Sequence, residues 1–200
     1  MNHTLKVAVL LLLVASFSTA QAAVITGLEP DDYGNGVDIS NTVAGTTIIT
    51  ASAIGNLVTG SSVFAVIDSI TSTGTKVFGY QSGTGTGTTL ANDFVSASLR
   101  FDFTPGVNKV TIDVTANDQS NPGQATLTAY NASNVVIGTA STGTMTYDVP
   151  ITLTVTGVID HVGLIGNFST ADNLTIPEPA TIALLGLGTL TILSRRRRKC

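Results

Sequence analysis

The sequence predicts an all-β protein, an antiparallel two-sheet β-sandwich of the jelly-roll type, and three observations lead to this prediction. Apolar and polar residues alternate with a period of two in several segments, which buries one face of each segment and leaves the other in water. Gly, Pro and Asn residues between these segments indicate turns. No stretch of residues 23–176 has the periodicity of a helix, and no repeat of fixed length indicates a propeller or a solenoid.

Residues 1–22 have the pattern of a secretory signal peptide. Lys6 gives a weakly basic start, residues 7–14 are apolar, and Ala20-Gln21-Ala22 forms a small-x-small cleavage site. We expect signal peptidase to cut between Ala22 and Ala23, and a cut after Ala20 fits the same pattern. The sequence therefore predicts an exported mature chain.

Residues 23–176 are predicted to form the sandwich domain. The alternation is clearest at residues 99–103, 110–115, 125–130 and 151–156. Further strands are expected at residues 46–53, 62–68, 76–80, 135–140, 161–165 and 173–176. Turns are predicted at Pro105-Gly106, at Asn121-Pro122-Gly123 and at residues 131–134.

The C-terminal residues 177–200 combine three features in a fixed order. Pro177-Glu178-Pro179 is expected to be extended, because two prolines fix φ and remove two backbone donors. Residues 180–193 carry no charge and predict a short transmembrane helix of about 21 Å. A basic block then predicts a cytoplasmic end by the positive-inside rule; it consists of Arg195, Arg196, Arg197, Arg198 and Lys199.

This order and spacing resembles the PEP-CTERM sorting signal of Gram-negative bacteria. The resemblance implies recognition, and cleavage near Pro-Glu-Pro, by an exosortase, which is a membrane-embedded cysteine protease or transpeptidase. Members of this group are often associated with exopolysaccharide and biofilm. Cys200 departs from the pattern, because the basic block usually ends the chain.

Four segments of the predicted domain resemble the ectodomains found on such proteins, which are similar to carbohydrate-binding and discoidin-like jelly rolls. These segments are residues 103–110, 125–130, 159–162 and 172–176. In calcium-bearing modules of that kind, the metal ligands come from an early acidic segment and a late Asp near the last strand. The resemblance therefore implies a fold and a candidate metal site.

Residues 29–38 are the densest group of hard oxygen ligands in the chain. Ca²⁺ takes six to eight oxygens from carboxylates, amides and backbone, and the interspersed Gly and Asn residues allow a tight loop. The spacing is not that of an EF-hand. The hypothesis is one structural calcium bound by Glu29, by Asp31 or Asp32, and by Asp172. A solvated acidic loop at the end of a strand is the other interpretation.

The predicted domain is strongly acidic. It holds three basic residues and twelve acidic ones, a formal charge of −9, whereas the whole chain carries −4. Because nucleic-acid binding depends on Lys and Arg side chains that neutralise phosphates, this charge excludes nucleic acid as an expected partner. The only cysteine is Cys200, so no disulfide is expected in the domain.

No catalytic residue is assigned from the sequence. His161 is the only histidine outside the predicted signal peptide, and the alternation with Val162 and Leu164 predicts that it lies at the surface. One histidine without cysteine cannot make the usual tetrahedral zinc site. Sugar binding often uses aromatic faces. The chain has no Trp, and of its tyrosines Tyr130 is expected to be exposed.

Three functions remain open. The favoured one is a secreted, exosortase-sorted, non-catalytic surface or matrix protein that associates with exopolysaccharide. The alternative is a secreted polysaccharide-active hydrolase on a sandwich scaffold. A permanent single-pass membrane protein is the third. The expected partners are signal peptidase, exosortase and, transiently, the membrane.

The first prediction concerns the C-terminus of the mature protein. We expect the protein recovered from cells with an intact exosortase to lack the basic block, because cleavage near Pro177-Glu178-Pro179 removes residues 195–199. Intact-mass spectrometry of the protein checks this, and cells without the exosortase gene are the control. Recovery of mature chains that still carry Arg195 to Lys199 from the exosortase-positive cells would contradict the prediction.

Overall fold

Two long antiparallel strands form the centre of the larger sheet. β7 (Ala97–Ala116) and β10 (Ile151–Asn167) pair along most of their length, from Ser98 opposite Ile165 to Val114 opposite Ile151. The computed structural model describes residues 25–55, 58–82, 89–91 and 97–177. These residues belong to the compact unit Ile25–Pro177.

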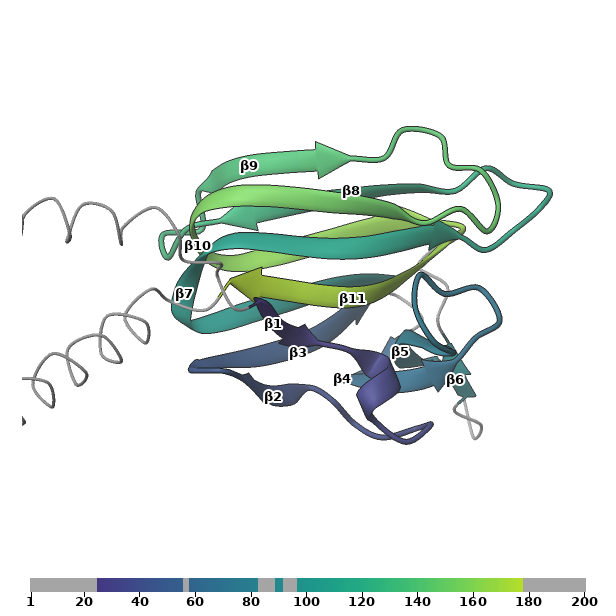
Figure 1. The fold of residues 1–200 in the computed structure, drawn as a ribbon, viewed down its shortest axis with the longest axis horizontal. Coiled ribbons are helices and arrows are strands. Elements are labelled where there is room, and N and C mark those ends of the chain that lie inside the picture. The colour runs from purple at the N-terminus through teal and green to yellow at the C-terminus, as the bar shows by residue number, and fades with distance from the viewer. Residues whose placement is uncertain (1–24, 56–57, 83–88, 92–96, 178–200) are drawn as a thin grey trace, which may run out of the picture. The chain divides into compact units, whose positions relative to one another are not determined.

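The other strands of this eight-stranded sheet pair on either side of the long strands (Figure 1). β3 (Thr47–Gly55) pairs with the first half of β7, and β11 (Ser169–Pro177) pairs with its second half. β8 (Gln124–Tyr130) pairs with β10, and β9 (Val136–Ser141) pairs with β8. β1 (Ile25–Leu28) pairs with β11, and β2 (Asn41–Ala44) pairs with β3.

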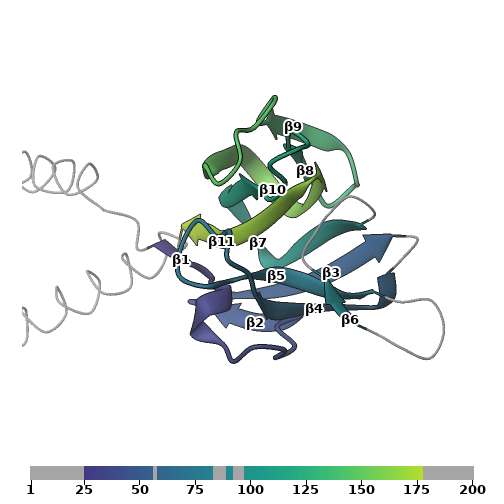
Figure 2. The ribbon, with the colours of Figure 1, turned by 90° about the vertical axis from the view of Figure 1, so that its right-hand side faces the viewer.

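A second sheet has three antiparallel strands. They are β4 (Val58–Ile67), β5 (Lys76–Ser82) and β6 (Thr89–Ala91), in that order. In Figure 2 this sheet lies near β2 and β3 and away from β8 and β9. A single turn of 3-10 helix, η1 (Pro30–Asp32), follows β1. The described residues are therefore all-β, as the sequence predicts, with two sheets around one core.

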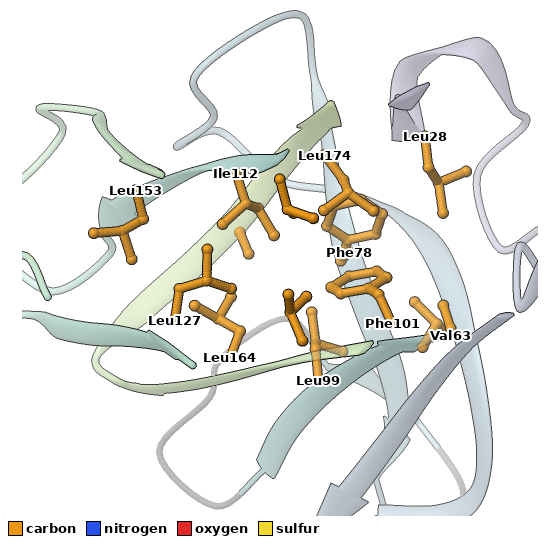
Figure 3. Close-up of a cluster of buried hydrophobic side chains, with 14 of the residues drawn as sticks. Leu28, Val63, Phe78, Leu99, Phe101, Ile112, Leu127, Leu153, Leu164 and Leu174 are labelled. Carbon is orange, nitrogen blue, oxygen red and sulfur yellow. The ribbon is translucent and has the colours of Figure 1, made fainter. Parts of the chain in front are cut away.

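The apolar residues of both sheets meet in that core (Figure 3). On β7 the alternation predicted from the sequence buries Leu99 and Phe101 and turns Arg100 to the opposite face. Phe101 packs edge-on against Phe78 of the smaller sheet, with ring centroids 5.2 Å apart. Such an aromatic pair contributes about 1 kcal/mol beyond the burial of its area. This contact joins the two sheets.

The turn predicted at Pro105-Gly106 is wrong, because β7 continues through it. The ladder between β7 and β10 is interrupted there: Asp102 pairs with His161, and the next pair is Val107 with Ile159. This bulge accommodates a proline, which has no N–H to give to the ladder. Gly106 is suited to the same place, because an added Cβ would lie 2.8 Å from the carbonyl oxygen of Ile159. The segments expected as separate strands are thus halves of β7 and of β10.

The remaining predicted strands correspond to β3, β4, β5, β8, β9 and β11 within a few residues. The short strands β1, β2 and β6 were not predicted. The predicted signal peptide and the predicted helix at residues 180–193 lie outside the described residues. Among the residues that are described, no helix has the length and hydropathy needed to cross a membrane.

The second prediction tests the contact between the sheets. We expect Phe101→Ala to lower the free energy of unfolding by about 3–5 kcal/mol, because it removes a fully buried ring and leaves a cavity. Urea denaturation measures this loss. The matched control is Val158→Ala, since Val158 is 85% exposed on β10, and it should change stability by less than about 0.5 kcal/mol. Equal losses for the two variants would contradict this account of the core.

Candidate functional site

The pairing of β1 with β11 brings the early acidic segment to the last strand. Leu28 lies opposite Leu174, so Glu29 leaves β1 close to Asp172. Pro30 then begins η1, where its fixed φ suits the first helical position. Glu29 caps this turn, and its Oε1 accepts a hydrogen bond from the backbone N–H of Asp31 at 3.4 Å. One local turn therefore positions two acidic side chains.

Asp172 is the buried member of this group, with 1% of its surface exposed. Its Oδ2 accepts hydrogen bonds from the Thr73 N–H at 3.1 Å, the Thr73 hydroxyl at 3.0 Å and the Ser72 hydroxyl at 3.1 Å. Its Oδ1 accepts one from the N–H of Asn173 at 2.8 Å. The loop between β4 and β5 thus covers the carboxylate and solvates it in place of water.

Asp31 completes the group from the other side. Its Oδ1 accepts a hydrogen bond from the Thr75 N–H at 2.9 Å and lies 3.6 Å from the Lys76 ammonium. Its Oδ2 is buried and has no hydrogen-bond partner among the described residues. The carboxylate lies against Gly74, where φ is +51° and an added Cβ would overlap it. The loop is therefore shaped around this side chain, and one of its oxygens is left unpaired.

Glu29, Asp31 and Asp172 form what we call the acidic cluster. One carboxylate oxygen from each lies within 4.8 Å of the others. Burial raises the pKa of Glu29 to about 7, and the negative charge of Asp172 and a hydrogen bond to it contribute in the same direction. Near neutral pH this cluster therefore holds either a proton or excess negative charge.

The structure brings together three of the four residues named for calcium. Asp32 is exposed and is not part of the acidic cluster. Sequence reasoning missed Asp113, which lies opposite Asp172 on β7 and accepts hydrogen bonds from Ser72 at 3.3 Å and the Asn173 amide at 3.0 Å. The alternation around Ile112 placed Asp113 on a polar face, but only the strand register shows its neighbour.

The donor set of the acidic cluster fits a hard divalent cation. All three side chains offer carboxylate oxygens, which Ca²⁺ prefers, and Thr73 contributes a hydroxyl that contacts both Glu29 and Asp172. The unpaired Oδ2 of Asp31 is the kind of buried oxygen that such an ion would satisfy. Calcium at this position stays a prediction.

A second group of polar side chains gathers on the polar face of the larger sheet. We call it the outer-face cluster; it consists of Arg100, Asp102, Tyr130, Asp160 and His161. The register aligns Asp102, His161 and Tyr130 across three neighbouring strands. They lie opposite to the core, because Phe101, Val162 and Ala129 beside them are buried.

The prediction that His161 lies at the surface is wrong, since only 4% of it is exposed. Its strand position does turn it to the polar face, as the alternation indicated. There the Tyr130 ring stacks on the imidazole, with centroids 4.7 Å apart and an angle of 10°. Nδ1 of His161 also lies 3.2 Å from Oδ2 of Asp160. Tyr130, expected to be exposed, is half-buried by this stacking.

Arg100 and Asp102 form the charged part of the outer-face cluster. Nε of Arg100 donates to both oxygens of Asp102 at 3.0 Å, and Nη2 donates to Oδ1 at 2.6 Å. These hydrogen bonds raise the pKa of Arg100 further, so the guanidinium stays charged. The two side chains remain 39% and 34% exposed. They present a fixed donor and acceptor pair to solvent.

Comparison with known protein families identifies the C-terminal segment. The PEP-CTERM protein-sorting motif matches residues 175–199, which include Pro177-Glu178-Pro179 and the basic block. The chain therefore carries a β-domain followed by a PEP-CTERM sorting motif. Such a motif implies export and sorting by an exosortase in Gram-negative bacteria. Of the sorting motif, Pro177 ends β11, and Glu178 and Pro179 lie outside the described residues, as do Ala22 and Ala23.

No curated protein matches the sequence. Among solved structures, the chain is similar to the K2 cleaved adhesin domain of Lys-gingipain, with 10% identity, a TM-score of 0.45, and coverage of 78% of this chain and 99% of that one. It is also similar to a DUF4465 family protein from Bacteroides caccae, with 11% identity, a TM-score of 0.46, and coverage of 79% and 100%.

A third similar structure is TmCBM61 in complex with β-1,4-galactotriose, with 10% identity, a TM-score of 0.36, and coverage of 65% of this chain and 88% of that one. At such identities these likenesses assign no ligand to the chain.

The third prediction concerns the acidic cluster. In a chelator, we expect the stability of the protein to fall as pH rises from about 4.5 to about 7, because folded Glu29 holds a proton there that unfolded Glu29 has lost. Millimolar calcium should raise the melting temperature at pH 7.5 by several degrees, since a ligand that binds only the folded state stabilises it. Thermal unfolding at a series of pH values measures both effects.

The variant Glu29→Gln should remove this pH dependence and most of the calcium shift. Asp32→Asn is the matched control, because Asp32 is the exposed neighbour outside the cluster, and it should keep both. No shift with millimolar calcium, or an equal shift in Glu29→Gln, would contradict the metal site.

Proposed function

We propose that the protein is a non-catalytic component of the bacterial surface or extracellular matrix, where it associates with exopolysaccharide in biofilm. The observation that carries the proposal is the sorting motif at residues 175–199, attached to an acidic β-domain. The predicted signal peptide takes the domain across the inner membrane, and residues 180–193 hold it there as an intermediate until exosortase cleaves the sorting motif. Once the tail is removed, the released domain meets the polysaccharide outside the cell.

The polar surface of the larger sheet supports this association. Its strands present many Thr side chains, for example Thr126 and Thr128 of β8, beside the half-buried Tyr130. Hydroxyl groups donate and accept hydrogen bonds, as sugar hydroxyls do. An excess of carboxylates keeps such a domain soluble and apart from anionic partners.

The acidic cluster supports a structural role in place of catalysis. Calcium there would connect three segments: η1, β11 and the loop that precedes β5. Without the ion, these segments meet through hydrogen bonds from the loop to Asp31 and Asp172. These are segments far apart in the sequence, so an ion that binds only their folded arrangement stabilises the domain. The cation would also neutralise carboxylates that lie within 4.8 Å of one another.

A polysaccharide hydrolase is the second candidate, and one observation favours it. The pKa of Glu29, raised to about 7, is that of a general acid, and a carboxylate lies beside it. In glycosidases, however, the two carboxyl groups stand about 5–10 Å apart on either side of the bond that breaks. Glu29 and Asp172 have oxygens within 4.8 Å of each other, and Asp172 is 1% exposed and accepts hydrogen bonds from Thr73, so this pair does not suit a glycosidic bond placed between two carboxyl groups.

The fourth prediction tests the association and separates it from hydrolysis. We expect the exported protein to co-purify with the extracellular polysaccharide of its own cells and to be released by enzymatic degradation of that polysaccharide. Incubation of the pure protein with the same material should produce no new reducing ends. Protein found only in the polysaccharide-free supernatant would contradict the proposal, and a steady rise in reducing ends would favour the hydrolase.

A further inference from the structure

We infer that the outer-face cluster is a shallow binding site for a neutral saccharide, held through its neighbouring hydroxyl groups. The inference rests on the proposed association with polysaccharide and assigns it to one place on the domain. It is carried by the arrangement of the cluster around Gly163, the residue of β10 two positions after His161.

Gly163 leaves the side-chain position at the centre of this cluster empty. It lies opposite Arg100 on β7 and opposite Thr128 on β8, on the same face as His161. The nearest heavy atom to a Cβ added at Gly163 would be Cε2 of Tyr130, at 3.8 Å. The next row of the sheet holds Asp102, His161 and Tyr130. Arg100, Thr128 and Tyr130 are therefore the neighbours of this empty position, which we call the floor of the site.

The charged pair beside this floor suits two adjacent sugar hydroxyls. The hydrogen bonds to Asp102 use the N–H groups on Nε and Nη2 of Arg100, and a guanidinium has five N–H groups in all. The Asp102 carboxylate has further lone pairs for a donor hydroxyl. Because the pair is already held together and partly exposed, binding need not order the long Arg100 side chain.

The stacked rings of Tyr130 and His161 form a rigid side of the site, next to Gly163. Tyr130 and His161 are nearly parallel, and Asp160 holds the imidazole through Nδ1. A residue locked by packing and by a hydrogen bond keeps its position without a ligand. Cε2 of Tyr130 then offers a C–H contact beside Gly163, and Arg100 and Thr128, the neighbours of Gly163 across the sheet, supply groups that can hydrogen-bond sugar hydroxyls.

The charge of the cluster selects the class of ligand. Arg100 offsets one of the two aspartates, so an anionic sugar would meet a net negative cluster on an acidic domain. A metal ion is the other chemistry to consider, since atoms of Asp102, Asp160 and His161 lie within 4.8 Å of one another. Both oxygens of Asp102, however, already accept from Arg100, whose charge repels a cation. A neutral polyhydroxylated ligand meets neither obstacle.

The fifth prediction uses affinity electrophoresis of the full-length chain in a detergent without sugar groups. Dextran and galactomannan serve as neutral probes, and alginate serves as the anionic one. We expect retardation by at least one neutral polysaccharide and none by alginate. Arg100→Gln should weaken binding at least tenfold because it removes the charged fork, and Gly163→Val should do so because it fills the floor with a residue suited to strands.

The matched control is Thr154→Val, an exposed position in the other half of β10, and it should bind like the unaltered chain. Melting temperatures show whether Arg100→Gln and Gly163→Val fold. If one of them does not, the binding measured for the other tests the site. If neutral polysaccharide binds and both folded variants bind equally well, the site is wrong and the proposed association stands.

If the unaltered chain binds neither dextran, galactomannan, alginate nor its own extracellular polysaccharide, both proposals fail. Titration calorimetry with Zn²⁺ tests whether the outer-face cluster binds a metal ion instead. A one-to-one complex that is lost in His161→Gln would overturn the saccharide assignment, and no heat of binding would agree with it.

Discussion

The pairing of β7 with β10 is the constraint on which the rest of the domain depends. These strands provide both edges to which the other strands of the larger sheet attach, and their buried side chains line the core. The bulge around Pro105 lets two halves of one strand serve different neighbours, β3 before it and β11 after it. Bulges bend a strand and increase its local twist. The two halves of β7, and the strands paired with them, therefore run in different directions.

The same constraint separates the two polar clusters. The outer-face cluster depends on the register between the first half of β7 and the second half of β10. The acidic cluster depends on β11, which attaches to the second half of β7 and in turn receives β1. Ile25 lies opposite Pro177 in that last pairing, so the first described residue of the domain pairs with the first proline of Pro-Glu-Pro. Folding of the domain thus holds residues 175–177, with which the sorting motif begins, in a strand.

The sequence predicted the features that depend on local patterns, such as strand positions and the sorting motif. It did not predict the features that depend on strand register, such as which side chains are neighbours. Alternation predicted most strands, and the order of Pro-Glu-Pro, apolar run and basic block predicted the sorting motif. The turn predicted at Pro105-Gly106 was wrong, because a proline within a bulge has the same local pattern as a proline in a turn. The exposure predicted for His161 was wrong, because alternation shows on which face of the sheet a side chain lies but not which other residues cover it. His161 is covered by the Tyr130 ring from another strand. The short strands β1 and β2 have too few residues to show alternation.

The two clusters differ in how they balance the charge of their carboxylates, and the different ligands proposed for them follow from this difference. In the outer-face cluster, Arg100 supplies a permanent positive charge to Asp102, so the remaining capacity is for hydrogen bonds. In the acidic cluster, the one ion pair found among the described residues is that of Lys76 with Asp31, at 3.6 Å. Glu29 and Asp172 have hydroxyl and N–H donors, but these donors bring no full positive charge. The raised pKa of Glu29 is one consequence of this missing positive charge, and the proposed calcium ion would supply it.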